Sequence, residues 1–132
     1  MKELIVVGAG PAGLMAAAKA AEYGARVTLL EKKARVGRKL SITGNGRCNL
    51  TTSVDGNDLI KGFPGNGRFL YSAFHEFSNT DLINFFHKRG LQTKVERGNR
   101  VFPVADKAED VVKILYNNAQ KAGAEILLST AV

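Results

Sequence analysis

Cysteine and histidine are scarce in this chain, with one cysteine and two histidines among 132 residues. The single Cys48 excludes an internal disulfide framework and a metal site built from cysteines alone. His75 and His87 do not have ligand-like spacing with Cys48, so we expect no metal site. A lone thiol suits a reducing compartment, and we therefore expect a cytoplasmic protein.

Long hydrophobic segments are also lacking. The uncharged run from Leu4 to Ala18 is shorter than the roughly 20 residues that a membrane helix needs, and glycines interrupt it. Ala16 to Ala18 could pass for a signal-peptide cleavage site, but Glu3 precedes the run and the glycines break its apolar core. We therefore expect neither a signal peptide nor a membrane partner.

Acidic residues are fewer than basic ones, 12 against 19, which gives a net charge of +7. This charge would suit nucleic acid, an anionic membrane or a phosphate-bearing ligand, and charge alone does not choose among them. Six basic residues gather in one glycine-rich stretch: Lys32, Lys33, Arg35, Arg38, Lys39 and Arg47. Because this stretch follows a predicted nucleotide site, we expect ligand phosphates there and no nucleic-acid partner.

The clearest periodic pattern covers the N-terminal residues. Residues 4–7 form a β-branched apolar run, which predicts a buried parallel strand. Small and apolar residues recur at helical spacing over 11–23, and Gly24 ends that pattern. Residues 26–31 alternate and close on Glu31, which predicts a second strand. Together these segments predict a β-α-β unit.

Six residues between the first strand and the helix form a Gly-x-Gly-x-x-Gly pattern: Gly8, Ala9, Gly10, Pro11, Ala12 and Gly13. Between a predicted strand and a predicted helix, this pattern indicates dinucleotide binding, and we expect Gly8, Gly10, Pro11, Ala12 and Gly13 to contact the cofactor. Gly8 allows the turn, Gly10 lets the pyrophosphate approach, and Gly13 lets the helix lie close to the sheet. Glu31, 18 residues after Gly13, would bind the ribose hydroxyls. This reasoning does not separate FAD from NAD, and a glycine-rich turn of another α/β protein is the alternative.

The middle of the chain, residues 32–104, is predicted to be an insertion. Residues 32–67 lack regular periodicity, which favours a functional loop. Two helices are predicted next, the second capped by Ser78 or Asn79, with their phenylalanines in the core. A β-hairpin is predicted around Arg97-Gly98-Asn99, with Pro103 in an edge strand.

The C-terminal segment, residues 105–132, is predicted to complete the fold. Asp106 and Glu109 resemble a capping box before an amphipathic helix that ends at Gly123. Residues 124–132 are predicted to form a third strand. The fold class is therefore α/β, a partial Rossmann-like parallel sheet of three core strands that carries an inserted helical and hairpin region.

Two longer stretches resemble the YhiN/BaiN-like flavoproteins. Residues 37–51 read GRKLSITGNGRCNLT, and residues 100–108 read RVFPVADKA. The resemblance extends over essentially all of this chain, whereas members of that family are about three times as long. We therefore expect an N-terminal part of such a protein, with the remaining C-terminal part of the same polypeptide as its partner.

The resemblance implies FAD as the cofactor, with Glu31 on its ribose, the loop from Gly44 to Asn49 near its flavin and Val132 near its adenine. The predicted cofactor-binding residues beyond the glycine pattern are Glu31, Lys32, Arg38, Lys39, Gly46, Arg47, Cys48, Asn49 and Val132. A solvated loop is an equal interpretation for Lys32. We expect a structural or main-chain contact role for Cys48, because disulfide reductases of related fold use a pair of cysteines and this chain has only one.

The predicted function is hydride transfer through bound FAD by an oxidoreductase, with NAD(P)H as a candidate electron donor. No catalytic acid or base can be named from the sequence, the substrate is unidentified, and we expect no activity from this part alone. The alternatives are a non-catalytic dinucleotide-binding module for NAD or an ADP moiety and, ranked last, an RNA-binding domain.

Overall fold

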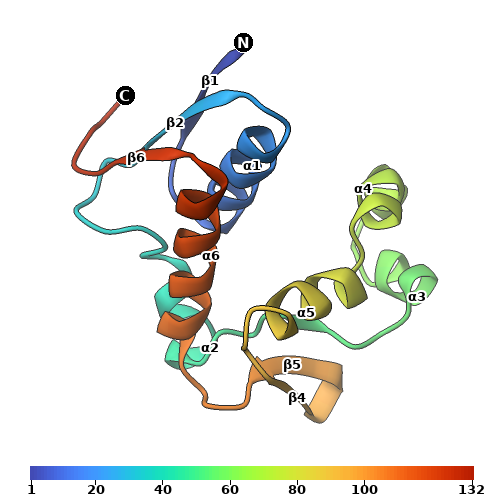
Figure 1. The fold of residues 1–132 in the computed structure, drawn as a ribbon. Coiled ribbons are helices and arrows are strands. Elements are labelled where there is room, and N and C mark those ends of the chain that lie inside the picture. Colours follow the sequence, from blue (N-terminus) through green and yellow to red (C-terminus); the bar gives the residue numbers. More distant parts are fainter.

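The computed structural model describes residues 1–132. Strands β1 (Glu3–Val7), β2 (Arg26–Leu30) and β6 (Glu125–Leu127) form a parallel sheet in the order β1-β2-β6. Helices α1 (Pro11–Glu22) and α6 (Ala108–Ala122) pack against each other and cover one face of this sheet (Figure 1). The predicted α/β class with three parallel strands is confirmed.

The main core lies between this sheet and its two helices. Val27 and Leu29 of β2 alternate inward, and they meet Leu14 and Ala17 of α1. Leu115 lies on the buried face of α6, and each of these five side chains is at most 3% exposed. The predicted apolar face of α6 is therefore confirmed, and Gly123 ends this helix in a left-handed conformation as expected.

The opposite face of the parallel sheet is bare. Ile5 and Val7 point to it from β1 and are 68% and 64% exposed. Leu30 and Leu127 share this face through the register of the sheet, in which Val7 pairs with Leu30 and Leu30 with Leu127. The outer edge of β1 has no neighbouring strand. Parallel sheets are normally covered on both faces, so this apolar surface is unusual for a complete fold.

A second, antiparallel sheet has the order β3-β5-β4. The predicted hairpin is confirmed as β4 (Thr93–Glu96) and β5 (Arg100–Pro103), whereas β3 (Thr51–Thr52) was not predicted. The prediction of an edge strand for Pro103 was wrong, because β5 is the middle strand. Pro103 is tolerated there because β3 pairs only with Val101 and Arg100, so no ladder bond is lost at the proline.

Helix α5 (Asn79–His87) lies between the antiparallel sheet and the main core, and Ser78 caps it as predicted. The Asp81 N–H donates to Ser78 Oγ at 3.1 Å, and the Ser78 N–H donates to the Asp81 carboxylate at 2.8 Å. Phe86 on this helix joins the main core. The Asn79 side chain donates to two main-chain carbonyl groups of the segment at β3 and just beyond it.

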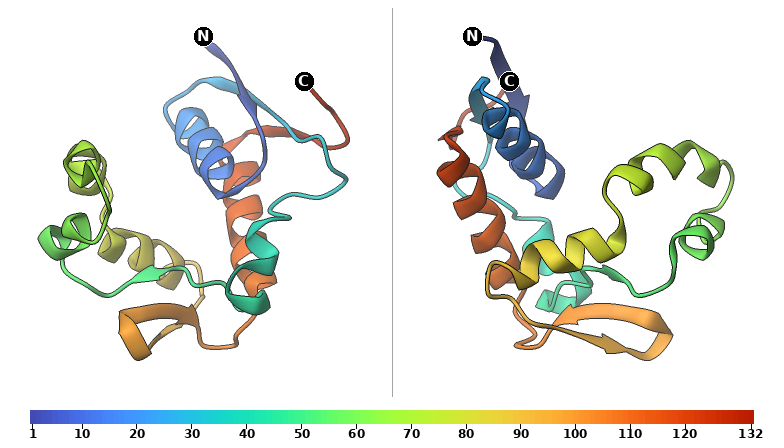
Figure 2. Two further views of the ribbon diagram at one scale, coloured as in Figure 1. Left: turned by 180° about the vertical axis from the view of Figure 1, so that it is seen from behind. Right: turned by 45° about the vertical axis from the view of Figure 1, so that its right-hand side comes forward.

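Residues 53–77 form what we call the arm. It contains α3 (Gly56–Lys61), a 3-10 turn (Gly67–Leu70) and α4 (Tyr71–Glu76), whose main contacts are with one another. The arm stands away from α1 and α6 in all three ribbon views (Figure 2). Gly67 is the only buried residue in it. The expectation that its phenylalanines lie in the core was wrong, and Phe69 is 82% exposed.

Two predictions about the C-terminal segment were also wrong. Lys107 occupies the N-cap position of α6, and its side chain forms no capping hydrogen bond. Asp106 does not form the predicted capping box, because its carboxylate binds Arg47 and Lys94 instead. The third strand is shorter than predicted and ends at Leu127. Finally, none of the helices combines the length and the apolar character that crossing a bilayer demands.

Candidate dinucleotide-binding site

The glycine loop joins β1 to α1 in a conformation that requires glycine at two positions. Gly8 has a φ of +97°, and its N–H donates to the Leu30 carbonyl oxygen at 2.7 Å. A Cβ atom on Gly13 would lie 1.9 Å from the Gly8 carbonyl oxygen. The predicted tight turn at Gly8 and the close approach of helix and strand at Gly13 are therefore confirmed.

The first turn of α1 offers free hydrogen-bond donors. The N–H groups of Gly10, Ala12 and Gly13 have no partner within the protein, and Pro11 has no N–H. A Cβ atom on Gly10 would meet nothing within 4 Å, so open space lies in front of the helix. Unpaired N–H groups and the positive end of the helix dipole favour an anionic group at this place.

Glu31 follows β2 and faces the glycine loop. Its carboxylate accepts hydrogen bonds from the Lys33 N–H at 2.9 Å and from the Ala9 N–H at 2.8 Å. These two donors lower the pKa of Glu31, the bond from Lys33 most strongly. Each carboxylate oxygen has a further lone pair, so Glu31 can hold the glycine loop and still accept ribose hydroxyls. Sequence reasoning missed the bond to Ala9, because motif spacing does not show which main-chain N–H a side chain meets.

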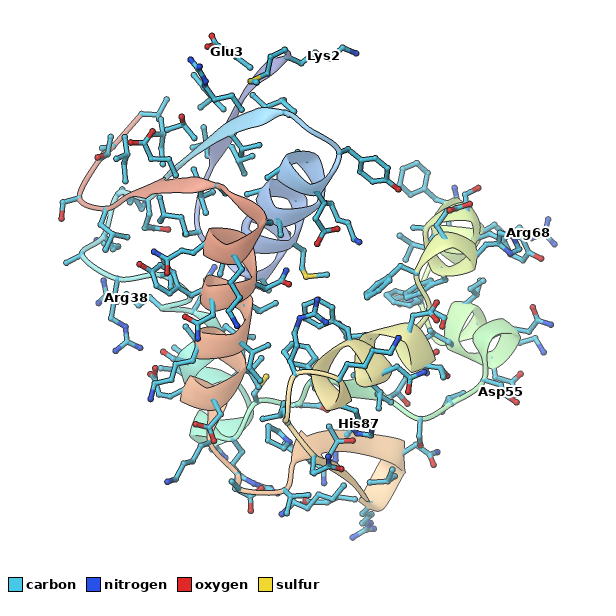
Figure 3. The ribbon with its side chains drawn as sticks, in the orientation of Figure 1. Lys2, Glu3, Arg38, Asp55, Arg68 and His87 are labelled. Carbon is cyan, nitrogen blue, oxygen red and sulfur yellow. The ribbon has the colours of Figure 1, made fainter.

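Three basic residues that were predicted to bind the cofactor follow β2 and form no ion pairs. Lys32, Arg38 and Lys39 are exposed and have no acidic partner, and Figure 3 shows Arg38 at the margin of the molecule. The Gly37 N–H donates to the Ala9 carbonyl oxygen at 2.8 Å, so the chain just before Arg38 lies against the glycine loop. Arg35 is different, because it binds Glu109 at 2.6 Å.

A second glycine-rich loop, residues 44–49, includes most of the short α2 (Thr43–Gly46). Gly44 and Asn45 both lie in the left-handed region, with φ of +56° and +57°, and both residues are exposed. Gly46 and Cys48 also have positive φ. This loop therefore has an unusual main-chain conformation, and its residues 44–46 lie exposed at the surface.

Cys48 is buried in the main core. Burial raises the pKa of its thiol, which keeps it protonated and poorly nucleophilic. This supports the structural role that the lone cysteine suggested. Asn49, the next residue, is exposed.

Arg47 points to carboxylates of the antiparallel region. Its Nε donates to Asp106 Oδ1 at 2.8 Å, and a terminal nitrogen also binds Glu96. The guanidinium carbon lies 4.1 Å from the centre of the Phe102 ring. Sequence reasoning placed Arg47 near phosphate and missed its two acidic partners. The second family-like stretch contains Phe102 and Asp106 and could have pointed to one of these partners, whereas Glu96 lies outside it.

Val132 is 88% exposed and lies five residues beyond the last residue of β6. The premise that it stands at the end of the third strand was wrong, although its contact with adenine stays a prediction. The Thr130 N–H donates to the Glu31 carbonyl oxygen at 2.8 Å. The terminal segment therefore passes close to the predicted ribose site.

The titratable residues do not assemble into a metal centre, since no group of three or more His, Cys, Asp and Glu side chains could hold an ion. His87 Nε2 lies 2.8 Å from Thr93 Oγ1, a contact between α5 and β4 that is remote from the glycine loop in sequence. The structure therefore adds no candidate catalytic acid or base to the sequence analysis.

Comparison with known proteins gives a family match over nearly the whole chain. The model of the HI0933-like protein Rossmann domain matches residues 2–132. The chain is 31% identical over 134 residues to 3-dehydro-bile acid delta(4,6)-reductase of Clostridium scindens, covering 100% of this chain and 32% of that protein. It is 33% identical over 131 residues to ribosomal RNA dihydrouridine synthase of Haemophilus influenzae, covering 98% and 32%. The chain thus spans about a third of the length of these relatives.

Solved structures share the fold at low identity. The THI4 protein of Thermovibrio ammonificans superposes with a TM-score of 0.57 and 19% identity, over 97% of this chain and 38% of that chain. BexE, an enzyme of BE-7585A biosynthesis, gives a TM-score of 0.53 at 19% identity, over 97% and 24%. At this identity the likeness describes the arrangement of helices and strands alone.

Proposed function

The chain belongs to the HI0933-like Rossmann-domain family, and on this premise we propose that it is the nucleotide-binding part of an FAD-dependent oxidoreductase. The observation that carries the proposal is the start of α1. There the N–H groups of Gly10, Ala12 and Gly13 have no partner within the protein, a Cβ atom on Gly10 would meet nothing within 4 Å, and the Glu31 carboxylate binds the adjacent Ala9 N–H. Donors for a pyrophosphate and an acceptor for a ribose therefore lie side by side.

The residues present fit an adenine dinucleotide. The glycine loop would hold the pyrophosphate and Glu31 the ribose, with positive charge from Lys32, Arg38 and Lys39. The segment that ends in Val132 would lie along the adenine. The proposed contacts on the flavin side are made by the main chain of Gly46, Arg47, Cys48 and Asn49, because the Cys48 side chain is buried and that of Arg47 binds carboxylates. When bound, FAD supplies hydride transfer, with NAD(P)H as the proposed donor.

The names of the two relatives support a substrate class. One is a delta(4,6)-reductase of a 3-dehydro bile acid, and the other makes dihydrouridine in ribosomal RNA. Both names describe the addition of two hydrogens to a carbon–carbon double bond. We propose the same reaction for the protein of which this chain forms part, on a double bond conjugated with a carbonyl group. An RNA-binding domain was ranked last and no nucleic-acid partner was expected from the sequence, but RNA now becomes a substrate to be tested.

The bare sheet face supports a further partner. Ile5, Val7 and Leu127 expose an apolar surface beside the unpaired edge of β1. Because the relatives are about three times as long as this chain, we propose that the remaining polypeptide covers this surface. A cytoplasmic location is proposed from the free buried thiol.

A non-catalytic dinucleotide-binding module is the second candidate. This candidate is supported by the side chains and main-chain groups at the site: they include hydrogen-bond donors for a nucleotide, and none of them is identified as a catalytic acid or base. This candidate binds an adenine dinucleotide without reducing a substrate, so activity assays distinguish it from the oxidoreductase.

The Gly10→Val variant tests the site. The added side chain would fill the open space in front of α1, so we expect FAD binding to be lost while the fold is kept. Binding is measured by quenching of flavin fluorescence on titration into the purified protein, and folding by circular dichroism. Mass spectrometry of small molecules released from the protein identifies the natural cofactor.

Gly56→Val is the matched control. Gly56 opens α3, and a Cβ atom there would also meet nothing within 4 Å. Its substitution should leave FAD binding unchanged. Equal FAD affinity in the Gly10→Val protein would refute the proposed docking, and a protein that quenches no flavin fluorescence at all would refute FAD as the cofactor.

A further inference from the structure

Two stretches that are far apart in the sequence meet beside the second glycine-rich loop. The Leu50 N–H donates to the Val101 carbonyl oxygen at 2.8 Å, at the point where β3 begins to pair with β5. A Cβ atom on Gly44 would lie 3.1 Å from the Phe102 ring. The loop formed by residues 44–49 therefore rests on the strand that carries the second family-like stretch.

Arg47 binds this loop to that region through its side chain. The guanidinium group lies over the Phe102 ring and binds Asp106 and Glu96. Its side chain is 33% exposed, so these contacts are partly shielded from water. A planar guanidinium between an aromatic ring and two carboxylates is held in one orientation, which a lysine could not reproduce.

The surrounding charges are balanced. Lys94 Nζ lies 2.8 Å from Asp106 Oδ2 and 3.3 Å from Glu96 Oε2, so two cations face two carboxylates. Hydrogen bonds from Lys94 and Arg47 lower the pKa of Asp106, and those from Arg47 and Lys94 lower the pKa of Glu96. We call these four residues the clamp. Arg47 is thus already neutralised, and the carboxylates beside it would repel a phosphate.

The loop needs such support because its main chain is strained. Five residues other than glycine have positive φ, and three of them surround Arg47: Asn45, Cys48 and Asp106. Such conformations persist where neighbouring contacts hold them, and they concentrate at functional sites. Gly44 and Asn45 are exposed, so this conformation determines which main-chain groups the loop presents at the surface.

We propose that Arg47 is a positioning residue, through which the clamp holds the exposed main chain of the second glycine-rich loop toward the flavin, and that its side chain is not a ligand of the pyrophosphate. This inference rests on the proposed function, since it assumes that FAD lies along the loop. It assigns to Glu96, Lys94 and Asp106 a part in cofactor binding without direct contact with the cofactor.

The two possible roles of Arg47 predict opposite effects for its partners. If Arg47 bound phosphate, Asp106→Asn and Glu96→Gln would free its charge, and FAD affinity would stay the same or increase. If Arg47 positions the loop, both substitutions weaken FAD binding in the same direction as Arg47→Gln. We expect Arg47→Gln and Asp106→Asn each to weaken binding by roughly tenfold, the scale of a lost charged hydrogen bond.

The experiment uses the whole protein loaded with FAD. Affinity is measured for FAD and for ADP, and the visible spectrum of the bound flavin is recorded for each variant. We expect the clamp variants to bind ADP normally but FAD weakly, with a changed flavin spectrum, because the loop faces the flavin and not the adenosine half. Arg47→Lys should restore only part of the affinity, because it lacks the planar fork.

Arg26→Gln is the matched control, since it breaks an exposed arginine–glutamate pair at the start of β1 and β2, at the opposite end of the sheet from the glycine loop. It should change neither the affinity nor the spectrum. Unchanged FAD binding in all clamp variants, or tighter binding in Asp106→Asn, would overturn the positioning role. A parent protein that fails to bind FAD would instead refute the proposed function. If Arg47→Gln does not fold, Asp106→Asn and Glu96→Gln still separate the two roles, because weaker FAD binding supports positioning and tighter binding supports a phosphate contact.

Discussion

The nucleotide-binding region and the arm differ in how they are stabilised. The first is built on a continuous core between the parallel sheet, α1 and α6, to which α5 contributes Phe86. The arm, residues 53–77, buries only Gly67, although it contains several aromatic residues. A hollow of about 620 Å³ lies between its helices, lined in part by Asp58, Tyr71 and His75. Because it buries more apolar surface, the first region is expected to be more stable to local unfolding than the arm.

Two glycine substitutions give the largest expected difference between these regions. A Cβ atom on Gly13 would lie 1.9 Å from the Gly8 carbonyl oxygen, and one on Gly67 would lie 2.4 Å from that of Ile60. We expect Gly13→Ala to force α1 off the sheet and abolish folding and FAD binding, because the clash is between main-chain segments of the core. Gly67→Ala should distort the arm alone and leave FAD affinity unchanged.

Circular dichroism and FAD titration check this pair of variants. A folded Gly13→Ala protein that binds FAD would show that helix and sheet need not approach so closely. Loss of FAD binding in Gly67→Ala would instead show that the arm is coupled to the cofactor site.

Truncation of one apolar side chain in each region should give the next largest difference. Leu115 of α6 is 3% exposed, and its replacement by alanine should lower the free energy of unfolding by about 3 kcal/mol. Phe69→Ala in the arm should change that free energy by less than about 0.5 kcal/mol in the 132-residue chain. Urea unfolding measures both. In the whole protein a larger effect of Phe69→Ala would locate a covering partner, and equal effects of both variants in the short chain would contradict the comparison.

The sequence predicted the nucleotide-binding region well because its signals are local. The strand, the glycine pattern, the helix and Glu31 all lie within the first 31 residues. Steric reasons predicted glycine at Gly8 and Gly13, and the structure confirms both. The arm was predicted less well. Its phenylalanines recur at helical spacing, but spacing does not tell whether a helix has anything to pack against.

The contacts of Arg47 could not be predicted for a different reason. Arg47 and Asp106 are 59 residues apart, and Arg47 and Glu96 are 49 apart. No periodicity connects such positions, and the basic composition of the loop suggested phosphate instead. Asp106 was assigned to a helix cap because Glu109 follows at the right spacing, yet its carboxylate finds two cations in the fold. Long-range ion pairs are decided by tertiary structure.

Removal of the cap of α5 tests the connection between the two regions. Ser78→Ala deletes a hydrogen bond to the Asp81 N–H, and we expect a loss of about 1 kcal/mol in the free energy of unfolding. Because Phe86 of this helix belongs to the main core, hydrogen exchange should accelerate in α5 while that of α1 and α6 changes little. Ser72→Ala on α4 is the matched control, since this serine is exposed and caps nothing. An unchanged exchange rate in α5 would show that the cap is not needed once Phe86 is buried.

The smallest expected effect is on the pH dependence of stability. The pKa values of Glu96 and Asp106 are lowered by hydrogen bonds from Arg47 and Lys94. A carboxylate with a lowered pKa stabilises the folded state above its unfolded pKa, and this contribution is lost as pH falls through the folded value. We therefore expect the Tm to fall on acidification below about pH 4, and Arg47→Gln to flatten that dependence. The change should be small and weaker in high salt, because these side chains are between a quarter and a half exposed. Thermal scans across this pH range decide the matter, since an equally steep profile without Arg47 would show that other carboxylates, such as Glu31 beside the glycine loop, cause the acid sensitivity.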